Sequence, residues 1–180
     1  DALPGSRHVP AHALRMLDHW DNIDVHPVMG QVERGYAGGS IFYADGTVRD
    51  DLSRVGAYAR LLAASGINRV SVNNVNVHRT EALLLTEGLG DVARIAEQFR
   101  PWGIRVHLAV SFAAPMTLGG LPTCDPLGPR CRRVVAGRRE RRLRRDPRLR
   151  RVRRQGRLRG PARPFAYGRD HADGANVLAP

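Results

Sequence analysis

Two amphipathic helices that alternate with two apolar strands between residues 47 and 112 constrain the fold of this chain most strongly. In each predicted helix, apolar residues recur every three or four positions, which is the spacing of one helical face. They are Leu52, Val55, Tyr58, Leu61 and Leu62 in the first helix, and Leu89, Val92, Ile95, Ala96 and Phe99 in the second. Gly66 supplies a stop for the first helix, and Pro101 and Gly103 end the second.

Each helix is followed by a segment with the composition of a buried strand, residues 67–77 and 104–112. Near-continuous apolar strands between amphipathic helices are typical of a parallel sheet covered by helices. An earlier candidate strand spans residues 14–17. We therefore predict an α/β fold, with a β/α barrel and an open sheet as alternatives.

Polar and aromatic residues gather at the C-terminal ends of these predicted strands. The first strand leads into Asp18, His19, Trp20, Asp21 and Asn22, the second ends in Asn73, Asn74 and Asn76, and the third contains Ser111. Barrels and open α/β sheets both place their active sites at this edge. We therefore expect the functional site there.

The chain changes character in the arginine tract, residues 130–163. Of these 34 residues, 17 are arginine and two are acidic, so the tract carries 17 − 2 = +15. The whole chain has a formal net charge of +12 and no lysine, which leaves 12 − 15 = −3 for the other residues. Arginines spaced by one residue or none point in all directions, so a packed strand cannot be built from the tract.

The sequence also bears on membrane association, metal binding and cellular location. No segment approaches the roughly 20 apolar residues of a membrane helix, so no membrane partner is expected. Cys124 and Cys131 fit neither a disulfide framework nor a zinc pattern, and His171 and Asp173 lack an evident third ligand. We expect no metal and no cofactor. No signal peptide is visible in residues 1–10, and the expected location is cytoplasmic, with secretion of a longer protein as the alternative.

Four blocks of sequence follow one another in a characteristic order. They are residues 14–22, beginning Leu14-Arg15-Met16, residues 33–42, beginning Glu33-Arg34-Gly35, the segment from Tyr58 to the asparagine-rich strand end, and residues 165–176. Together they resemble the α-glucuronidases that remove 4-O-methylglucuronic acid from xylan side chains. The resemblance implies a partial TIM (β/α)8 barrel, incomplete at its C-terminus. Residues 1–129 would hold the first βα units, the tract would cover the fourth strand, and the barrel would resume in residues 164–180.

The resemblance also implies an activity, the release of (4-O-methyl)glucuronic acid from xylo-oligosaccharides during xylan breakdown. Inverting hydrolysis of this kind uses a carboxylic acid that protonates the leaving oxygen and a second carboxylate, roughly 6.5 to 9.5 Å away, that activates water. The family carries its acid in a Lys-Ala-Asp-Ser-Glu-Gly motif where this chain has the arginine tract, and its base carboxylates beyond the C-terminus of this chain. The chain as written is therefore expected to lack the catalytic pair and to be inactive.

A reading frame displaced by one base offers an explanation of the tract. An arginine codon CGN, read one base later, encodes Val, Ala, Asp, Glu or Gly. Across residues 146–160 the same shift permits Ile-Pro-Asp-Phe-Gly-Gly-Phe-Val-Val-Lys-Ala-Asp-Ser-Glu-Gly, which ends in the family motif. We interpret the tract as frameshifted, with the lysine in the slot of Gln155 and the general acid in the slot of Arg159. Each restored residue depends on the choice of a degenerate base.

The candidate substrate-binding residues are Trp20, Asp21, Asn22, Arg34, Asn73 and Asn74. Trp20 offers a flat apolar face to a pyranose ring, with Asp21 and Asn22 beside it for hydroxyl groups; the alternative is a core aromatic. Arg34 can pair with a uronate carboxylate in bidentate fashion; the alternative is a structural salt bridge. The asparagines can line the site or cap the strand end and the following turn.

Two other function classes stay open. The charge of the tract would give strong, salt-dependent contacts with nucleic-acid phosphates. RNA-binding arms usually mix arginine with other residue types and lie at a terminus or linker, so we expect no specific nucleic-acid partner. The other class is that of a non-catalytic carbohydrate-binding fragment. The expected partners are glucuronic-acid-substituted xylo-oligosaccharides, and the parent enzyme could form a homodimer.

Overall fold

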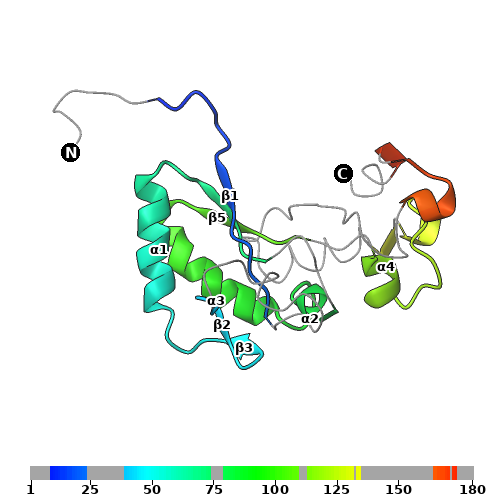
Figure 1. Ribbon diagram of the computed structural model, residues 1–180, viewed down its shortest axis with the longest axis horizontal. Helices are drawn as coiled ribbons and strands as arrows, with labels where there is room; N and C mark the ends of the chain where they lie inside the picture. The colour runs from blue at the N-terminus through cyan, green and yellow to red at the C-terminus, as the bar shows by residue number, and fades with distance from the viewer. Residues whose placement is uncertain are drawn as a thin grey trace.

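A three-stranded parallel sheet with helices packed on it forms the larger part of the molecule (Figure 1). The computed structural model describes residues 9–23, 39–73, 79–109, 113–131, 133–134, 164–170 and 172–173. The sheet contains β1 (Met16–Asp18), β4 (Arg69–Ser71) and β5 (Arg105–His107), and its order β1-β4-β5 follows the chain. The predicted α/β fold is therefore confirmed as a mixed α/β arrangement.

Both predicted helices are present, and they pack against each other. α1 (Ser53–Ala64) precedes β4, and α3 (Leu89–Phe99) precedes β5. Crossovers between neighbouring parallel strands are right-handed, so two consecutive ones place their helices on the same face of a sheet. The contact between α1 and α3 agrees with this arrangement (Figure 1). The predicted stops are confirmed, because Gly66 and Gly103 adopt left-handed φ values of 78° and 67°.

The prediction that Leu61 belongs to the buried face of the first helix is wrong. Its side chain is 62% exposed, whereas the adjacent Leu62 is buried together with Val55 and Ala59. Successive residues in a helix are separated by about 100° around the axis, and in α1 this rotation turns Leu61 toward solvent while Leu62 packs in the core. The second helix buries Val92, Ile95 and Phe99 as expected.

The strands are shorter than the apolar runs that predicted them. The strand expected at residues 14–17 is displaced to Met16–Asp18, and the other two ladders each cover three residues. Val72, Leu108 and Ala109 are buried beyond the ends of these ladders. An apolar run predicts burial, whereas a strand also needs a hydrogen-bonded neighbour, which explains the difference. Residues 74–77 and 110–112 of the expected strands lie outside the described residues.

Aromatic side chains fill the core between the two helices. Phe99 of α3 is fully buried, and its ring centroid lies 6.4 Å from that of Phe42 and 6.3 Å from that of Tyr58. The Tyr58 contact is edge-to-face, a favoured geometry for aromatic pairs. This cluster fixes α1 and α3 relative to the segment around Phe42.

A two-stranded hairpin, β2 (Tyr43–Ala44) and β3 (Thr47–Val48), was missed by the sequence analysis. Its turn consists of Asp45 and Gly46, with φ values of 50° and 76°. Positive φ at both central residues is the requirement of the turn that matches the twist of a hairpin, and Asp-Gly is a preferred pair for it. The hairpin places Phe42 and Tyr43, which are fully buried, beside the end of β1.

The remaining elements are short. α2 (Arg79–Leu83) follows β4, the 3-10 helix η2 (Arg100–Trp102) follows α3, and α4 (Ala114–Thr117) follows β5. A further 3-10 helix, η3 (Pro164–Tyr167), lies near α4 (Figure 1). Within the described parts of the chain, no helix has the length and apolar character needed to cross a membrane.

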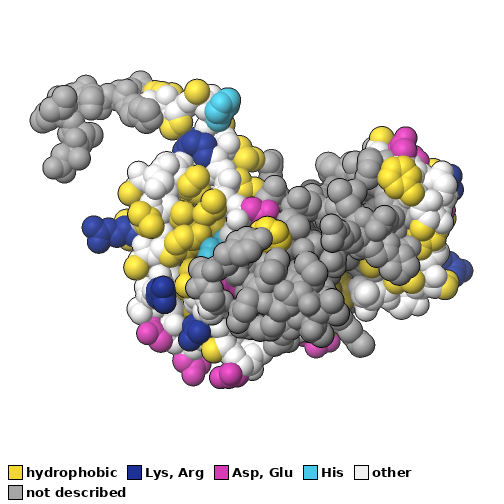
Figure 2. Space-filling model, in the orientation of Figure 1, with side chains coloured by type: hydrophobic (Ala, Val, Ile, Leu, Met, Phe, Trp, Pro, Cys, Tyr) yellow, Lys and Arg dark blue, Asp and Glu magenta, His cyan; other side chains and the backbone are white. Residues whose placement is uncertain are grey.

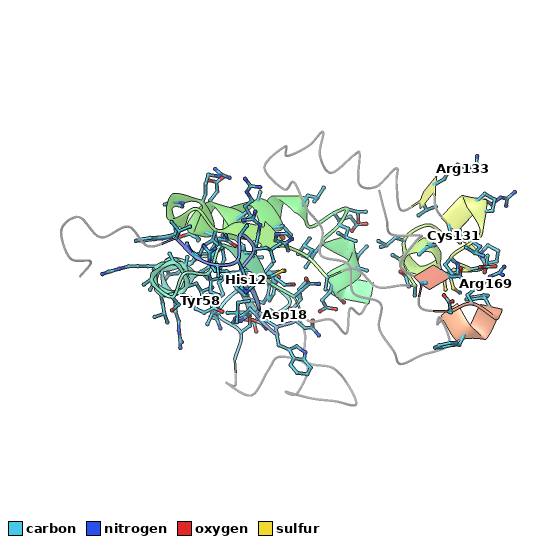
Figure 3. All side chains as sticks on the ribbon, turned by 90° about the horizontal axis from the view of Figure 1, so that it is seen from above. His12, Asp18, Tyr58, Cys131, Arg133 and Arg169 are labelled. Carbon is cyan, nitrogen blue, oxygen red and sulfur yellow. The ribbon has the colours of Figure 1, made fainter. Side chains whose placement is uncertain are left out.

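Contacts between Cys124, Asp125, Tyr167 and Arg169, here called the flank clamp, join the chain before the arginine tract to the chain after it. Both nitrogens of one guanidinium edge contact the carboxylate: Arg169 Nε lies 3.1 Å from Asp125 Oδ1, and Nη2 lies 3.2 Å from Oδ2. The Tyr167 hydroxyl lies 3.3 Å from both the backbone nitrogen and Sγ of Cys124. Figure 3 shows Cys131 and Arg169 together, at the opposite end of the molecule from Asp18 and Tyr58.

Cys124 of the flank clamp and the nearby Cys131 are both free and buried. Burial raises the pKa of both Cys124 and Cys131. At Cys124, the contact with the Tyr167 hydroxyl offsets part of this rise. A raised pKa keeps a thiol protonated and unreactive at neutral pH. Both cysteines therefore have the properties of structural thiols.

Breaking the ion pair of the flank clamp is expected to lower stability at pH 7 but not in acid. The Arg169 guanidinium holds the pKa of Asp125 below its ordinary value. The pair therefore stabilises the fold above pH about 4, the usual Asp pKa, and this contribution is lost as the pH falls through the lower pKa of the folded state. We expect Asp125→Asn to lower the midpoint of thermal unfolding at pH 7, by a margin that shrinks below pH about 4.

Asp50 offers a matched control for this measurement. Its side chain is fully exposed, and its Oδ1 lies 4.0 Å from Arg94 Nη2. Such an exposed pair contributes little, so Asp50→Asn is expected to leave the midpoint of thermal unfolding unchanged at pH 7 and at pH 3. An equal loss for Asp125→Asn at pH 7 and pH 3 would show that the carboxylate charge does not account for the effect.

Candidate functional site

The candidate site begins where β1 and β4 end. Asp18, Ser71 and His107 are aligned across the three parallel strands, so the carboxyl ends of the strands meet at one edge. The β1 loop, residues 19–23, leaves this edge after one further ladder-like bond, in which His19 N donates to Ser71 O at 2.9 Å. The structure therefore brings the predicted residues after β1 next to those after β4.

Trp20 is the large apolar side chain that the β1 loop presents to solvent. Its side chain is 41% exposed, so it is not a core aromatic. An exposed indole beside buried polar groups provides a flat surface against which an apolar face of a ligand can stack.

Asp21 is buried, and both of its carboxylate oxygens contact other groups of the protein. It is 1% exposed, and its Oδ2 accepts a hydrogen bond from Ser40 Oγ at 2.5 Å. The same oxygen lies 3.4 Å from His19 Nε2, and Oδ1 accepts the backbone N–H of Asn22 at 2.9 Å. Asp21 thus braces the β1 loop against the segment that leads into β2.

His19 connects this carboxylate to α1. Its Nδ1 lies 2.9 Å from the Tyr58 hydroxyl, and its ring packs edge-on against Phe42 with centroids 4.8 Å apart. Burial raises the pKa of Tyr58 to about 12, so the hydroxyl is protonated at neutral pH. Ser40 contacts the carboxylate of Asp21 rather than the imidazole, and the three groups therefore lack the order of a Ser-His-Asp triad.

Asn73 joins the ends of β4 and β5. Its Nδ2 donates to Ala109 O at 3.1 Å, and its Oδ1 accepts from Ala109 N at 2.7 Å, so the side chain takes the place of a ladder partner. This is the strand-capping role that the sequence analysis left as an alternative. Asn22, on the neighbouring β1 loop, is likewise fully buried.

The candidate binding residues Arg34 and Asn74, and Arg159, the slot of the general acid, lie outside the described residues. The same holds for Asn76, Ser111, Gln155 and His171. The structure thus gathers Trp20 and Asp21, with the two buried asparagines, at one sheet edge. Within the described residues, no group of three His, Cys, Asp or Glu side chains is placed to hold a metal ion.

Two buried residues at this edge were not singled out by the sequence analysis. Glu81 of α2 is 2% exposed; its Oε1 accepts the backbone N–H of Ile23 at 3.0 Å, and its Oε2 has no hydrogen-bond partner among the described residues. Tyr43 is 1% exposed, and its hydroxyl likewise has no hydrogen-bond partner in the part of the chain that the structure describes. Burial raises the pKa of Tyr43, and the nearby carboxylates of Asp21 and Glu81 raise it further. Nothing in the local sequence separates Glu81 from an ordinary surface glutamate.

Comparison with known proteins identifies the family. The model of the glycosyl hydrolase family 67 middle domain matches residues 5–180. The chain belongs to this family. The resemblance drawn from the four sequence blocks is therefore confirmed.

Fungal relatives of this family 67 chain carry the name of one enzyme. The chain is 44% identical to Alpha-glucuronidase A of Emericella nidulans over 170 residues, which are 94% of this chain and 20% of the relative. It is also 44% identical to Probable alpha-glucuronidase A of Aspergillus oryzae over the same shares, and to that of Aspergillus terreus over 97% of this chain and 20% of the relative. The family 67 chain thus spans about a fifth of the length of these curated relatives.

Proposed function

We propose that this chain contributes to an α-glucuronidase that removes (4-O-methyl)glucuronic acid from substituted xylo-oligosaccharides by inverting hydrolysis. The observation that carries the proposal is the 44% identity to a protein named Alpha-glucuronidase A across 94% of the chain. Buried polar residues and an exposed tryptophan at the carboxyl ends of parallel strands support it, because α/β enzymes bind their substrates there.

The proposed architecture is part of a (β/α)8 barrel. A barrel requires parallel strands in chain order, with every helix on the outer face. The strand order β1-β4-β5 and the contact between α1 and α3 support this proposal for the first three strands. An open sheet wound on both faces would separate consecutive helices wherever the strand order reverses.

In the proposed site, Trp20 stacks on a pyranose ring, and Asp21 holds the β1 loop in place. Arg34 is proposed to pair with the uronate carboxylate, and the general acid is proposed in the slot of Arg159. The acid protonates the leaving oxygen, while a carboxylate on the opposite side of the sugar removes a proton from the attacking water.

Nucleic-acid binding is not favoured by the described surface. On the face in Figure 2, the arginine side chains that are drawn are scattered, and acidic side chains lie near those at the lower left. The described residues of this face therefore form no continuous basic track for phosphates.

Replacing Trp20 with alanine tests the stacking role. We expect the variant to bind a 4-O-methylglucuronic-acid-substituted xylo-oligosaccharide about tenfold more weakly, equivalent to about 1.4 kcal/mol, because the ring loses its apolar partner. Isothermal titration calorimetry on this chain measures the Kd.

Trp102 is the matched control, since it is 42% exposed and lies in η2, before β5 rather than after a strand. Trp102→Ala is expected to leave the Kd unchanged. Equal affinities of the Trp20→Ala variant and the unaltered chain would contradict the stacking role, and no binding by the unaltered chain would contradict the proposed function.

A further inference from the structure

The β1 loop is held by side chains from three other parts of the chain. Tyr58 of α1 contacts His19, and Ser40 binds Asp21. The third contact comes from Glu81 of α2, whose Oε1 accepts the backbone N–H of Ile23 across 58 positions of sequence. The first two contacts hold the start and middle of the loop, and Glu81 holds its end.

The burial of Glu81 needs an explanation beyond the stability of α2. An acidic residue in the first turn of a helix is favourable on the surface, where it keeps its hydration. Glu81 is instead 2% exposed, and within the described parts of the chain one of its two oxygens has no hydrogen-bond partner. Burying a carboxylate that is only partly hydrogen-bonded is unfavourable. The buried position does, however, let Glu81 accept the hydrogen bond from the backbone N–H of Ile23.

We propose that Glu81 is a positioning residue, which fixes the end of the β1 loop so that Trp20 keeps its ring presented for stacking. This inference rests on the proposed function, because it assigns Glu81 a part in binding the same oligosaccharide. Trp20 lies three residues before Ile23, and Asp21 and Asn22, between them, are buried. With the end of the loop released, the buried middle would anchor Trp20 from one side only.

The test separates a hydrogen-bond acceptor from a buried charge. Glu81→Gln keeps an oxygen that can accept from Ile23 N–H, whereas Glu81→Ala removes it. Each change is made together with Trp102→Phe, so that Trp20 is the remaining one of the two tryptophans and its fluorescence can be measured alone. Acrylamide quenching without ligand reports the exposure of Trp20, and titration with the 4-O-methylglucuronic-acid-substituted xylo-oligosaccharide gives the Kd.

We expect Glu81→Ala to change the quenching constant and to weaken binding about tenfold, a loss typical of one hydrogen bond. Glu81→Gln is expected to restore both readings to within about twofold of the Trp102→Phe parent. Glu87, an exposed glutamate in the turn after α2, is the matched control, and Glu87→Ala should change neither reading.

A reading that does not depend on the folding of Glu81→Ala comes from hydrogen exchange at the Ile23 amide. Glu81→Asp keeps the charge, but its side chain is one methylene shorter. We expect exchange at Ile23 to accelerate about tenfold in Glu81→Asp and to stay slow in Glu81→Gln.

Unchanged quenching and unchanged affinity in a folded Glu81→Ala variant would overturn the positioning role. So would equally fast exchange in Glu81→Gln and Glu81→Asp, because the acceptor oxygen would then be irrelevant. If the parent binds no oligosaccharide, the proposed function fails, while quenching and exchange still decide whether Glu81 fixes the loop.

Discussion

Replacing Phe99 with alanine is expected to lower the free energy of unfolding by about 3 to 5 kcal/mol. The side chain is fully buried in α3, and its ring meets those of Phe42 and Tyr58. Truncation removes apolar contacts and leaves a cavity at the junction of both helices and the segment before the hairpin. Since small domains are stable by only about 5 to 15 kcal/mol, the variant would unfold at a much lower urea concentration. Circular dichroism at increasing urea measures the change.

Leu61 supplies a control within the same layer of helices. It is apolar and lies on α1, but it is 62% exposed, so Leu61→Ala should change the free energy of unfolding by no more than about 0.5 kcal/mol. Comparable losses for the two variants would contradict the assignment of the core. The pair also tests the correction that only one of the adjacent leucines, Leu62, faces the sheet.

Sequencing the gene through the arginine tract is expected to reveal a displaced reading frame, with a codon for glutamate in the slot of Arg159. In an enzyme assembled with the corrected frame, replacing that glutamate with glutamine should lower the rate of hydrolysis by about 10²- to 10⁴-fold, which is the usual contribution of a general acid. The rate of (4-O-methyl)glucuronic acid release from a substituted xylo-oligosaccharide measures it.

The leaving group provides a chemical control for this prediction. In an aryl glucuronide made from an acidic phenol, the phenolate leaves without being protonated. The same glutamine variant should therefore retain most of its rate on that substrate. Equal losses on both substrates would indicate a role other than general acid. A tract confirmed in frame in the gene would remove the hypothesis altogether.

The parts of the fold that local chemistry determines could be predicted from the sequence. The two long helices follow from apolar residues at helical spacing, and their ends follow from Gly66 and Gly103, which need little tertiary context. The turn at Asp45 and Gly46 carried an equally local signal and was missed because the flanking strands are only two residues long. Strand length was overestimated because burial continues beyond hydrogen-bonded pairing.

The site was predicted less completely, because its contacts depend on which segments meet. The position of Trp20 at the end of a strand was readable, but the burial of Asp21 depends on Ser40, nineteen residues away. The bond between Glu81 and Ile23 spans 58 residues and follows no periodic pattern. Likewise, whether Asn73 lines the site or caps the strand end depends on Ala109, which follows the neighbouring strand β5.

The flank clamp has a consequence for how the chain tolerates change. Its ion pair joins residues 44 positions apart, so forming it closes a large polymer loop. The entropy lost in such a closure grows only with the logarithm of the contour length, and doubling the loop adds about 0.6 kcal/mol. Insertions or altered codons between the two ends therefore change the free energy of closure very little. A gene could acquire a long run of foreign residues here while the segments on either side continue to recognise each other.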